Sequence, residues 1–201
     1  MRKSIFALFM LFVVATACDE KQVSPDNSLV IADRKYVTVT IGNQVWTAEN
    51  YAGPGGVSRN ASAKGPIYGK YYSKAELASI SLPEGWRVPT AEDYKTLAAY
   101  HGISIPSTLG VTNDIKKLTS TENWKHVNGT NSSGFNAHPA GYIFGDGEAI
   151  DGDIAEFWTT EGYSFSIQEA GANLASLRVA MYDSNNSPDF RFNVRFVKDL
   201  R

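Results

Sequence analysis

The stretch Pro83–Leu97, PEGWRVPTAEDYKTL, brings a turn and a helix start together within a few residues. Thr90 can cap a helix, and Asp93 stands three residues later, as in a capping box with Asp in place of Glu. Pro89 sets the entry just before the cap, and residues 101–102, His-Gly, are a typical helix end. The stretch therefore predicts a helix that begins after Thr90.

The residues on either side of that cap indicate which side chains point into the core. Tyr94 and Leu97 recur at helical spacing, so we expect both in the core. Trp86 and Val88 alternate with Arg87 before the cap, which predicts a short strand with the two apolar side chains inward. The whole stretch is typical of a strand-to-helix corner, and it carries no catalytic pattern.

Alternating residues upstream of the corner predict a β-hairpin. Residues 36–41 alternate in side-chain character, Gly42-Asn43 is a turn signal, and residues 44–50 form the return strand. A short helix is expected after Ser73. Further strands are expected around Tyr142–Phe144, in the part of GDGEAIDGDIAEFWTT that follows the acidic loop, and in ASLRVAMYD and RFNVRFVKDL. Trp46, Trp124 and Trp158 are expected in the core together with Leu118.

The N-terminus resembles an export signal. Arg2 and Lys3 precede a short apolar run, and small residues lead into Cys18, so residues 1–17 are predicted to be a signal peptide. The run is too short to span a bilayer of roughly 30 Å. ATAC also resembles a bacterial lipobox, which makes Cys18 the expected lipidation site. The alternative is an ordinary secreted protein with a lone Cys at its cleavage site.

Three segments follow from this reading: the signal peptide, a lipidated Cys with a flexible tether at 18–29, and a single globular domain at 30–201. Without the leader the chain keeps 17 basic and 21 acidic side chains. Asp19-Glu20 after the Cys resembles the surface-export signal of Bacteroidota lipoproteins, whereas in enterobacteria an Asp there favours the inner membrane. We expect an exported, membrane-anchored lipoprotein, at the outer membrane or cell surface.

Composition and motifs argue against several function classes. The formal net charge is −2, and the body has no run of Lys or Arg, so nucleic acid is not an expected partner. The three histidines are scattered, no G-x-S-x-G elbow occurs, and no Lys follows the GTNSSG run as a phosphate loop requires. The chain is therefore not expected to be an enzyme.

Two sets of residues are candidates for binding. Asp146, Glu148, Asp151 and Asp153 lie on a Gly-rich loop and offer the hard oxygen ligands that calcium prefers, although the spacing is not that of an EF-hand. The alternative is a solvated acidic hairpin tip, and no other cofactor is expected. Tyr68, Tyr71 and Tyr72 follow a Gly-rich loop and are the aromatic residues that we expect to offer sugar-stacking faces.

The order of several motifs resembles one known family. VTIGNQVWTAENY, GKYYSKAEL, the corner stretch, IKKLTSTENW, GTNSSGFNAHPAGY, AEFWTT and NVRFVKD occur in the order typical of the Fibrobacter succinogenes major paralogous domain. Its members are typically exported or surface lipoproteins, and no single activity defines them. WRVPTAEDY is also similar, more weakly, to the RLPTEAEWE segment of sulfatase-modifying-factor domains.

These resemblances imply an α+β, C-type-lectin-like fold with small twisted antiparallel sheets, two or three short helices and long loops. Relatives often carry Cys at the positions held here by Leu82 and Phe196. The resemblance therefore implies a Leu–Phe contact in place of a disulfide. The formylglycine-generating members need reactive cysteines in the body of the domain, and this body has none.

Together these observations predict a non-catalytic, lipid-anchored domain that binds an extracellular glycan or surface protein. The alternative function is a structural or assembly subunit of a surface complex. An enzyme with an unrecognised site is the third alternative.

Overall fold

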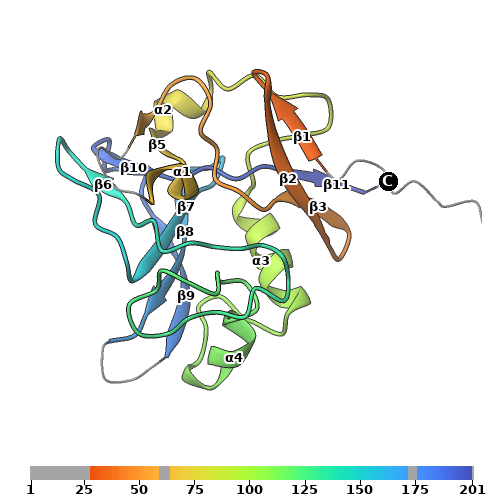
Figure 1. The fold of residues 1–201 in the computed structure, drawn as a ribbon, viewed down its shortest axis with the longest axis vertical. Coiled ribbons are helices and arrows are strands. Elements are labelled where there is room, and N and C mark those ends of the chain that lie inside the picture. The colour runs from red at the N-terminus through yellow and green to blue at the C-terminus, as the bar shows by residue number, and fades with distance from the viewer. Residues whose placement is uncertain (1–27, 59–63, 172–175, 201) are drawn as a thin grey trace, which may run out of the picture.

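The computed structural model describes residues 28–58, 64–171 and 176–200, which form three antiparallel sheets and short helices (Figure 1). The sheets have the orders β1-β2-β3-β11, β4-β5-β10-β6 and β7-β8-β9. The strands are β1 Ser28–Ile31, β2 Arg34–Ile41, β3 Gln44–Thr47, β4 Val57–Ser58, β5 Lys70–Ser73, β6 Ile143–Phe144, β7 Ile154–Trp158, β8 Tyr163–Glu169, β9 Leu177–Asp183, β10 Phe190–Phe192 and β11 Val197–Asp199. The helices are α1 Gly65–Tyr68, α2 Lys74–Leu77, α3 Ala91–Tyr100 and α4 Thr112–Ile115, with a 3-10 turn at Leu109–Val111. The chain is thus a sheet-rich α+β protein, as predicted.

The predicted signal peptide and Cys18 lie outside the described residues. Within those residues, no helix combines the length and the apolar character needed to cross a membrane. Ser28 and Leu29, which the sequence analysis assigned to the tether, pair with β2 as part of β1, and Leu29 is buried.

The predicted hairpin is confirmed, and its two faces pack against two different apolar cores. β2 and β3 are joined through Gly42-Asn43, where Gly42 has a φ of +59°. Tyr36 packs into a core with Tyr51, whereas Ile41 packs on the opposite face into a second core. Val37 stays exposed. The start of β2 therefore buries side chains on one face of the sheet, and the end of β2 buries side chains on the opposite face.

The predicted helix start at Thr90 is confirmed, whereas the short strand predicted at residues 86–88 is reduced to a single bridge between Arg87 and Val197. Thr90 Oγ1 accepts a bond from the Asp93 backbone N–H at 3.1 Å, and the Thr90 N–H donates to Asp93 Oδ2 at 2.7 Å. Arg87 points away from the core and donates to Asp93 at 2.9 Å and to Asp199 at 2.7 Å. The corner is thereby tied to β11. Trp86 is half-buried at the margin of a core, where full burial was expected.

α3 packs between the first and third sheets (Figure 1). Tyr94 and Leu97 are buried as predicted, and the Tyr94 ring stacks on Phe165 of β8 with centroids 4.3 Å apart. Trp46 of β3 lies 5.2 Å from the same ring. A single amphipathic helix thus joins two sheets into one apolar core.

Two elements differ from the sequence analysis. β8 was not predicted, although Phe165 and Ile167 alternate with serines and are buried. RFNVRFVKDL was expected to be one strand, but it is divided into β10 and β11, which belong to different sheets. The division occurs because the intervening Arg195 is drawn fully into the interior.

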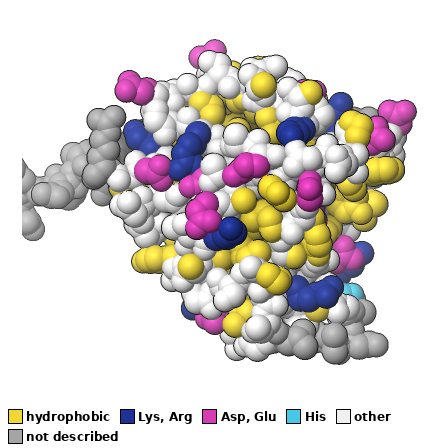
Figure 2. Space-filling view, turned by 180° about the vertical axis from the view of Figure 1, so that it is seen from behind, with side chains coloured by type: hydrophobic (Ala, Val, Ile, Leu, Met, Phe, Trp, Pro, Cys, Tyr) yellow, Lys and Arg dark blue, Asp and Glu magenta, His cyan; other side chains and the backbone are white. Residues whose placement is uncertain are grey.

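The surface mixes charged and apolar side chains. On the face turned away in Figure 1, acidic and basic side chains are interspersed with apolar ones (Figure 2). Val30 and Val37, on the outer part of the first sheet, are among the exposed apolar residues. That nucleic acid is not a partner stays a prediction from the sequence.

Candidate functional site

A buried arginine, Arg195, joins two loops of the domain through hydrogen bonds. The Arg195 Nε donates to Asn50 Oδ1 at 2.6 Å, and Nη1 donates to the Thr47 carbonyl at 2.7 Å. Further bonds run from Nη1 to the Phe135 carbonyl at 3.0 Å and from Nη2 to the Asn136 carbonyl at 3.1 Å. The side chain therefore holds residues 47–50 against residues 135–136.

The charge of Arg195 is buried, and no carboxylate of the described residues forms an ion pair with it. Its guanidinium carbon lies 5.0 Å from the Phe135 ring centroid and 5.3 Å from that of Phe157. Burial lowers the pKa of Arg195 to about 9. The side chain thus stays charged at neutral pH, and carbonyl and amide oxygens supply its stabilisation.

Helix α1 and the start of β5 are fixed against the same loop. Asn50 Nδ2 donates to the Tyr68 carbonyl at 2.9 Å, and Asn193 Nδ2 donates to it at 3.0 Å. Gly69 has a φ of +71°, and a Cβ there would lie 2.7 Å from the Asn50 Cβ. Only glycine allows the two backbones to approach this closely. Gly69 also lines an open space beside α1.

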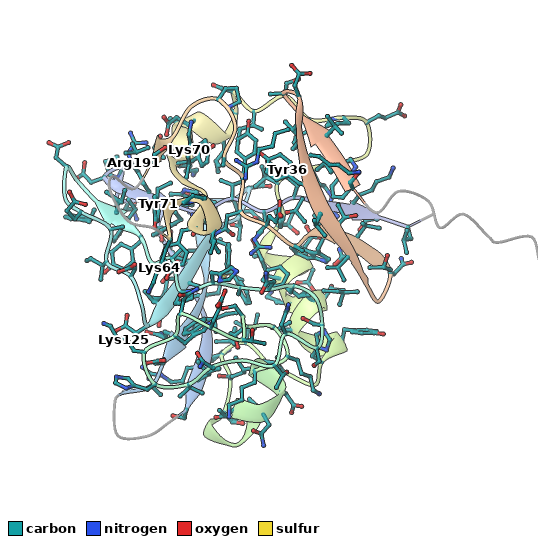
Figure 3. The ribbon with its side chains drawn as sticks, viewed as in Figure 1. Tyr36, Lys64, Lys70, Tyr71, Lys125 and Arg191 are labelled. Atoms are coloured by element: carbon teal, nitrogen blue, oxygen red, sulfur yellow. The ribbon has the colours of Figure 1, made fainter. Side chains whose placement is uncertain are left out.

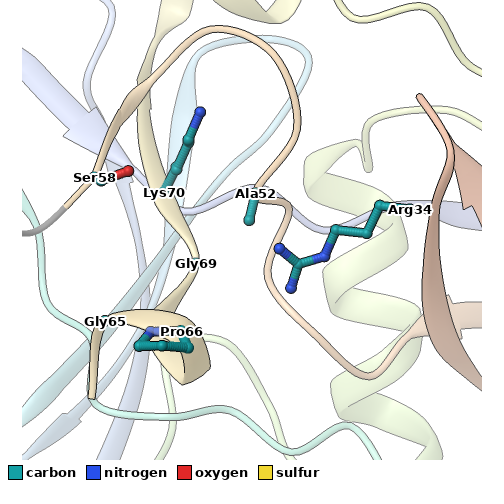
Figure 4. A pocket seen from close by; sticks show the side chains of 7 residues that line it. All are labelled: Arg34, Ala52, Ser58, Gly65, Pro66, Gly69 and Lys70. Carbon is teal, nitrogen blue, oxygen red and sulfur yellow. The ribbon is translucent and has the colours of Figure 1, made fainter. Parts of the chain in front are cut away.

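That space is a cavity of about 370 Å³ between β2, α1 and the start of β5 (Figure 4). The guanidinium of Arg34 reaches into it from β2 and lies 5.2 Å from the Tyr36 ring. Lys70, on the other side, donates to the carbonyls of Gly53 and Gly55 at 2.9 and 3.1 Å. Figure 3 places Tyr36 and Lys70 in the whole fold. Lys70 thus holds the loop at residues 53–55, and Arg34 supplies a positive charge within the cavity.

A second cavity of about 240 Å³ shares Arg34 and Pro66 with the first. Its other lining residues are Ala48, Glu49, Asn50, Ile67, Asn136 and His138. The two cavities adjoin each other at Arg34 and Pro66, and we call the pair the Arg34 hollow. It combines a guanidinium, a carboxylate, side-chain amides and an imidazole beside the exposed Ile67.

His138 is the buried titratable group of this hollow. Its side chain is 9% exposed, and its Nδ1 has no hydrogen-bond partner in the part of the chain that the structure describes. Desolvation, and secondarily the charge of Arg195, lower the pKa of His138 to about 4. The imidazole is therefore neutral at physiological pH and offers one donor and one acceptor.

The hollow suits a ligand rich in hydroxyl groups. Arg34 can donate several hydrogen bonds, Glu49 can only accept them when ionised, and Asn136 can do both. Pro66 and the exposed Ile67 add an apolar surface. Glu49 is the one carboxylate among the residues that line the hollow, so the paired carboxylates of a glycosidase are not assembled there.

The three candidate tyrosines are not surface platforms, and this expectation is wrong. Tyr68, Tyr71 and Tyr72 are all fully buried. The Tyr71 hydroxyl donates to the Ala140 carbonyl at 2.6 Å, and the Tyr72 ring stacks on Tyr51. β5 lies between β4 and β10 and is covered on both faces, so consecutive tyrosines are both inside.

The acidic loop does not gather its carboxylates around a metal position. Asp146 and Glu148 are exposed, Asp151 is half-buried, and Asp153 forms an ion pair with Lys125 at 3.1 Å. Across the described residues, no group of three or more His, Cys, Asp or Glu side chains could hold a metal ion. The calcium hypothesis is therefore wrong for this loop, which forms a solvated tip after β6.

Of the residues predicted to have structural roles, one apolar cluster holds Leu82, Trp86, Trp158 and Phe196, whereas another holds Tyr94 and Leu97. Trp158 and Phe196 are buried in the first of these clusters, and Leu82 packs against it at the margin. The Trp158 Nε1 donates to the Tyr72 carbonyl at 2.6 Å. Leu82 and Phe196 thus belong to the same apolar neighbourhood, as the cysteine positions in relatives imply.

The pattern of these elements follows a known domain. The family model of the Fibrobacter succinogenes major domain matches residues 39–198, from the middle of β2 to β11. The chain belongs to the Fibrobacter succinogenes major domain family. No curated protein and no solved structure matches this chain. Arg34 lies before the matched range, so the family domain and the preceding strand segment build the hollow together.

Sequence reasoning about this family member missed its most perturbed carboxyl group. Glu156 of β7 is buried, and desolvation raises its pKa to about 7, although the hydroxyls of Ser164 and Ser166 oppose that rise. A Glu inside the apolar run IAEFW was the available signal. Glu156 does not line the Arg34 hollow.

Proposed function

We propose that this member of the family is an exported, lipid-anchored and non-catalytic domain that binds a glycan in the Arg34 hollow. The observation that carries the proposal is the pair of adjoining cavities with mixed donors and acceptors beside an apolar patch. Ligand sites of this kind occupy roughly 300–1,000 Å³ and place a few polar groups among apolar ones.

The fold offers a second line of support. Small antiparallel sheets, short helices and long loops suit the C-type-lectin-like plan that the resemblance implies, and we propose that plan for this chain. Loops held on a rigid sheet make variable binding surfaces. Here Arg195 and Asn50 hold two such loops in place at the hollow.

Anchoring at Cys18 has its own test. Cells expressing the full chain and fed an alkyne-tagged palmitate are expected to label it, because lipidation requires the thiol of the lone Cys. The Cys18→Ser variant should lose the label completely. Persistent labelling of that variant would show that Cys18 is not the lipidated residue.

The glycan site is tested with the full-length lipoprotein in detergent on a glycan array, followed by titration of the best oligosaccharide. Arg34→Ala is expected to weaken binding roughly tenfold or more, because a hydrogen bond from a charged donor is worth about 1.5–3 kcal/mol. Lys35→Ala is the matched control, since it removes a neighbouring exposed cation whose side chain points to the opposite face of β2. Its affinity should stay within about twofold.

The control also defines failure. If both variants bind as wild type does, the hollow is not the site. If both lose affinity equally, the attraction is general charge and not a contact inside the hollow.

A further inference from the structure

β9 is one of the two edge strands of the third sheet, and its outer edge pairs with no strand of the described chain. β9 spans Leu177–Asp183 and pairs only with β8 within its sheet. Ser107 takes the place of a partner at one residue: its N–H donates to the Val179 carbonyl at 2.9 Å, and its Oγ accepts from the Val179 N–H at 2.9 Å. Because outward groups recur every second residue of an antiparallel strand, the N–H and C=O of Met181 also point away from β8.

Other sheet edges are shorter or covered. The edge of β7 is met by Gly141 at Ala155 and by Asn193 at Phe157. The free side of β11 is bridged by Arg87, and β4 and β6 have two residues each. Along β9, Ser107 is the bridging residue in the described chain and α4 packs near the strand, so the open part of the edge is the stretch after Val179, with the outward backbone groups of Met181 and Asp183.

A groove of about 420 Å³ runs along this open edge. Its floor includes Tyr182, which is 46% exposed and accepts a hydrogen bond from Gln168 at 2.7 Å. Met181 and Ile105 line the other side. The charged side chains among the described residues of the lining are the cations Arg178 and Lys95, of which Lys95 is also paired with the exposed Glu92 at 3.1 Å.

We propose that this edge binds an extended, acidic segment of a partner protein, which adds to the sheet as a strand beside β9. The segment would continue the pairing that Ser107 begins, through hydrogen bonds to the Met181 backbone. Strand side chains alternate between faces. Acidic residues would therefore face Arg178 and Tyr182, while the residues between them face Met181 and Ile105.

The recognition follows known physical rules. Main-chain bonds to an open edge supply affinity, and alternate side-chain positions supply specificity. Cationic side chains beside the edge select an acidic partner and reject a basic one. The inference does not depend on glycan binding, because the groove and the Arg34 hollow have no lining residue in common.

The first test selects peptides from a displayed library of random decapeptides on the full-length protein in detergent. Enriched peptides are expected to alternate Asp or Glu with apolar residues. Enrichment of basic or helix-forming peptides, or no enrichment, would overturn the proposal.

The second test measures the affinity of a synthetic enriched peptide for three variants. Met181→Pro removes the outward N–H without removing a ladder bond to β8, so affinity should fall roughly tenfold, whereas Met181→Ala should change it by about twofold or less. Arg178→Glu should weaken binding roughly fivefold or more through repulsion of the acidic residues. Equal affinity of all three variants would contradict the proposal.

A site-specific readout separates binding from misfolding. Hydrogen exchange of the Met181 amide should slow on saturation with the peptide in the wild type and in Met181→Ala. If light scattering instead shows a dimer, and the Met181 amide is already protected without peptide, a second copy of the chain covers the edge and the proposal is wrong.

Discussion

Replacing Arg195 with Met is expected to destabilise the protein by about 3–5 kcal/mol, because it breaks a buried network of hydrogen bonds. Met fills a similar volume, but it leaves four oxygens without their donor: the buried Asn50 Oδ1 and carbonyls of Thr47 and Phe135, and the partly buried carbonyl of Asn136. Each unsatisfied buried acceptor costs about 1–3 kcal/mol, partly offset because the buried charge disappears too. Urea unfolding of the two proteins measures the difference.

The matched control is Arg191→Met on β10. Arg191 also forms a polar contact, an ion pair with Glu76 at 2.7 Å, but both side chains are partly exposed. That change should cost about 1 kcal/mol or less. If Arg195→Met were as stable as this control, Arg195 would not be the residue that holds the loops together.

Glu156→Gln is expected to stabilise the protein at pH 8 by about 3 kcal/mol and to have little effect near pH 4. The pKa of Glu156 is raised from 4.5 to about 7 in the folded protein, so the folded state binds the proton more tightly than the unfolded state. Its contribution is therefore fully present below pH 4.5 and is lost as the pH rises through 7. Gln at position 156 stays neutral at every pH, so the variant does not lose this stability as the pH rises.

His138 acts in the opposite direction and must be separated from Glu156. Its lowered pKa of about 4 gives a contribution that is present above pH 6.5 and is lost as the pH falls. Comparing wild type with Glu156→Gln at each pH cancels the His138 term, because both proteins contain it. A difference in stability that stays constant from pH 4 to pH 8 would contradict the assignment.

Local patterns predicted the parts of the fold that local forces decide. The hairpin follows from alternation and a Gly-Asn turn, and α3 follows from a cap and a helical spacing that its own sequence contains. β8 carried the same kind of signal, since Phe165 and Ile167 alternate with serines, and its omission was an error of reading.

The candidate site could not be predicted in this way. Tyr71 and Tyr72 are buried because residues distant in the chain pack on the two faces of β5: Tyr71 contacts the loop at Ala140, and Tyr72 shares a cluster with Trp158. The Arg34 hollow likewise joins β2 to loops near residues 49 and 138. Two loops that line the hollow are held in place by Arg195. No local sequence pattern indicates that this arginine is buried.

The most direct test of the central claim follows the imidazole protons of the three histidines by NMR while the best array oligosaccharide is added. His138 lines the Arg34 hollow, whereas His101 ends α3 and His126 lies on the surface. A ligand in the hollow should shift the His138 signals in a saturable way and leave the other two unchanged. Saturable binding with His138 unmoved, or an array without a binding glycan, would contradict the account.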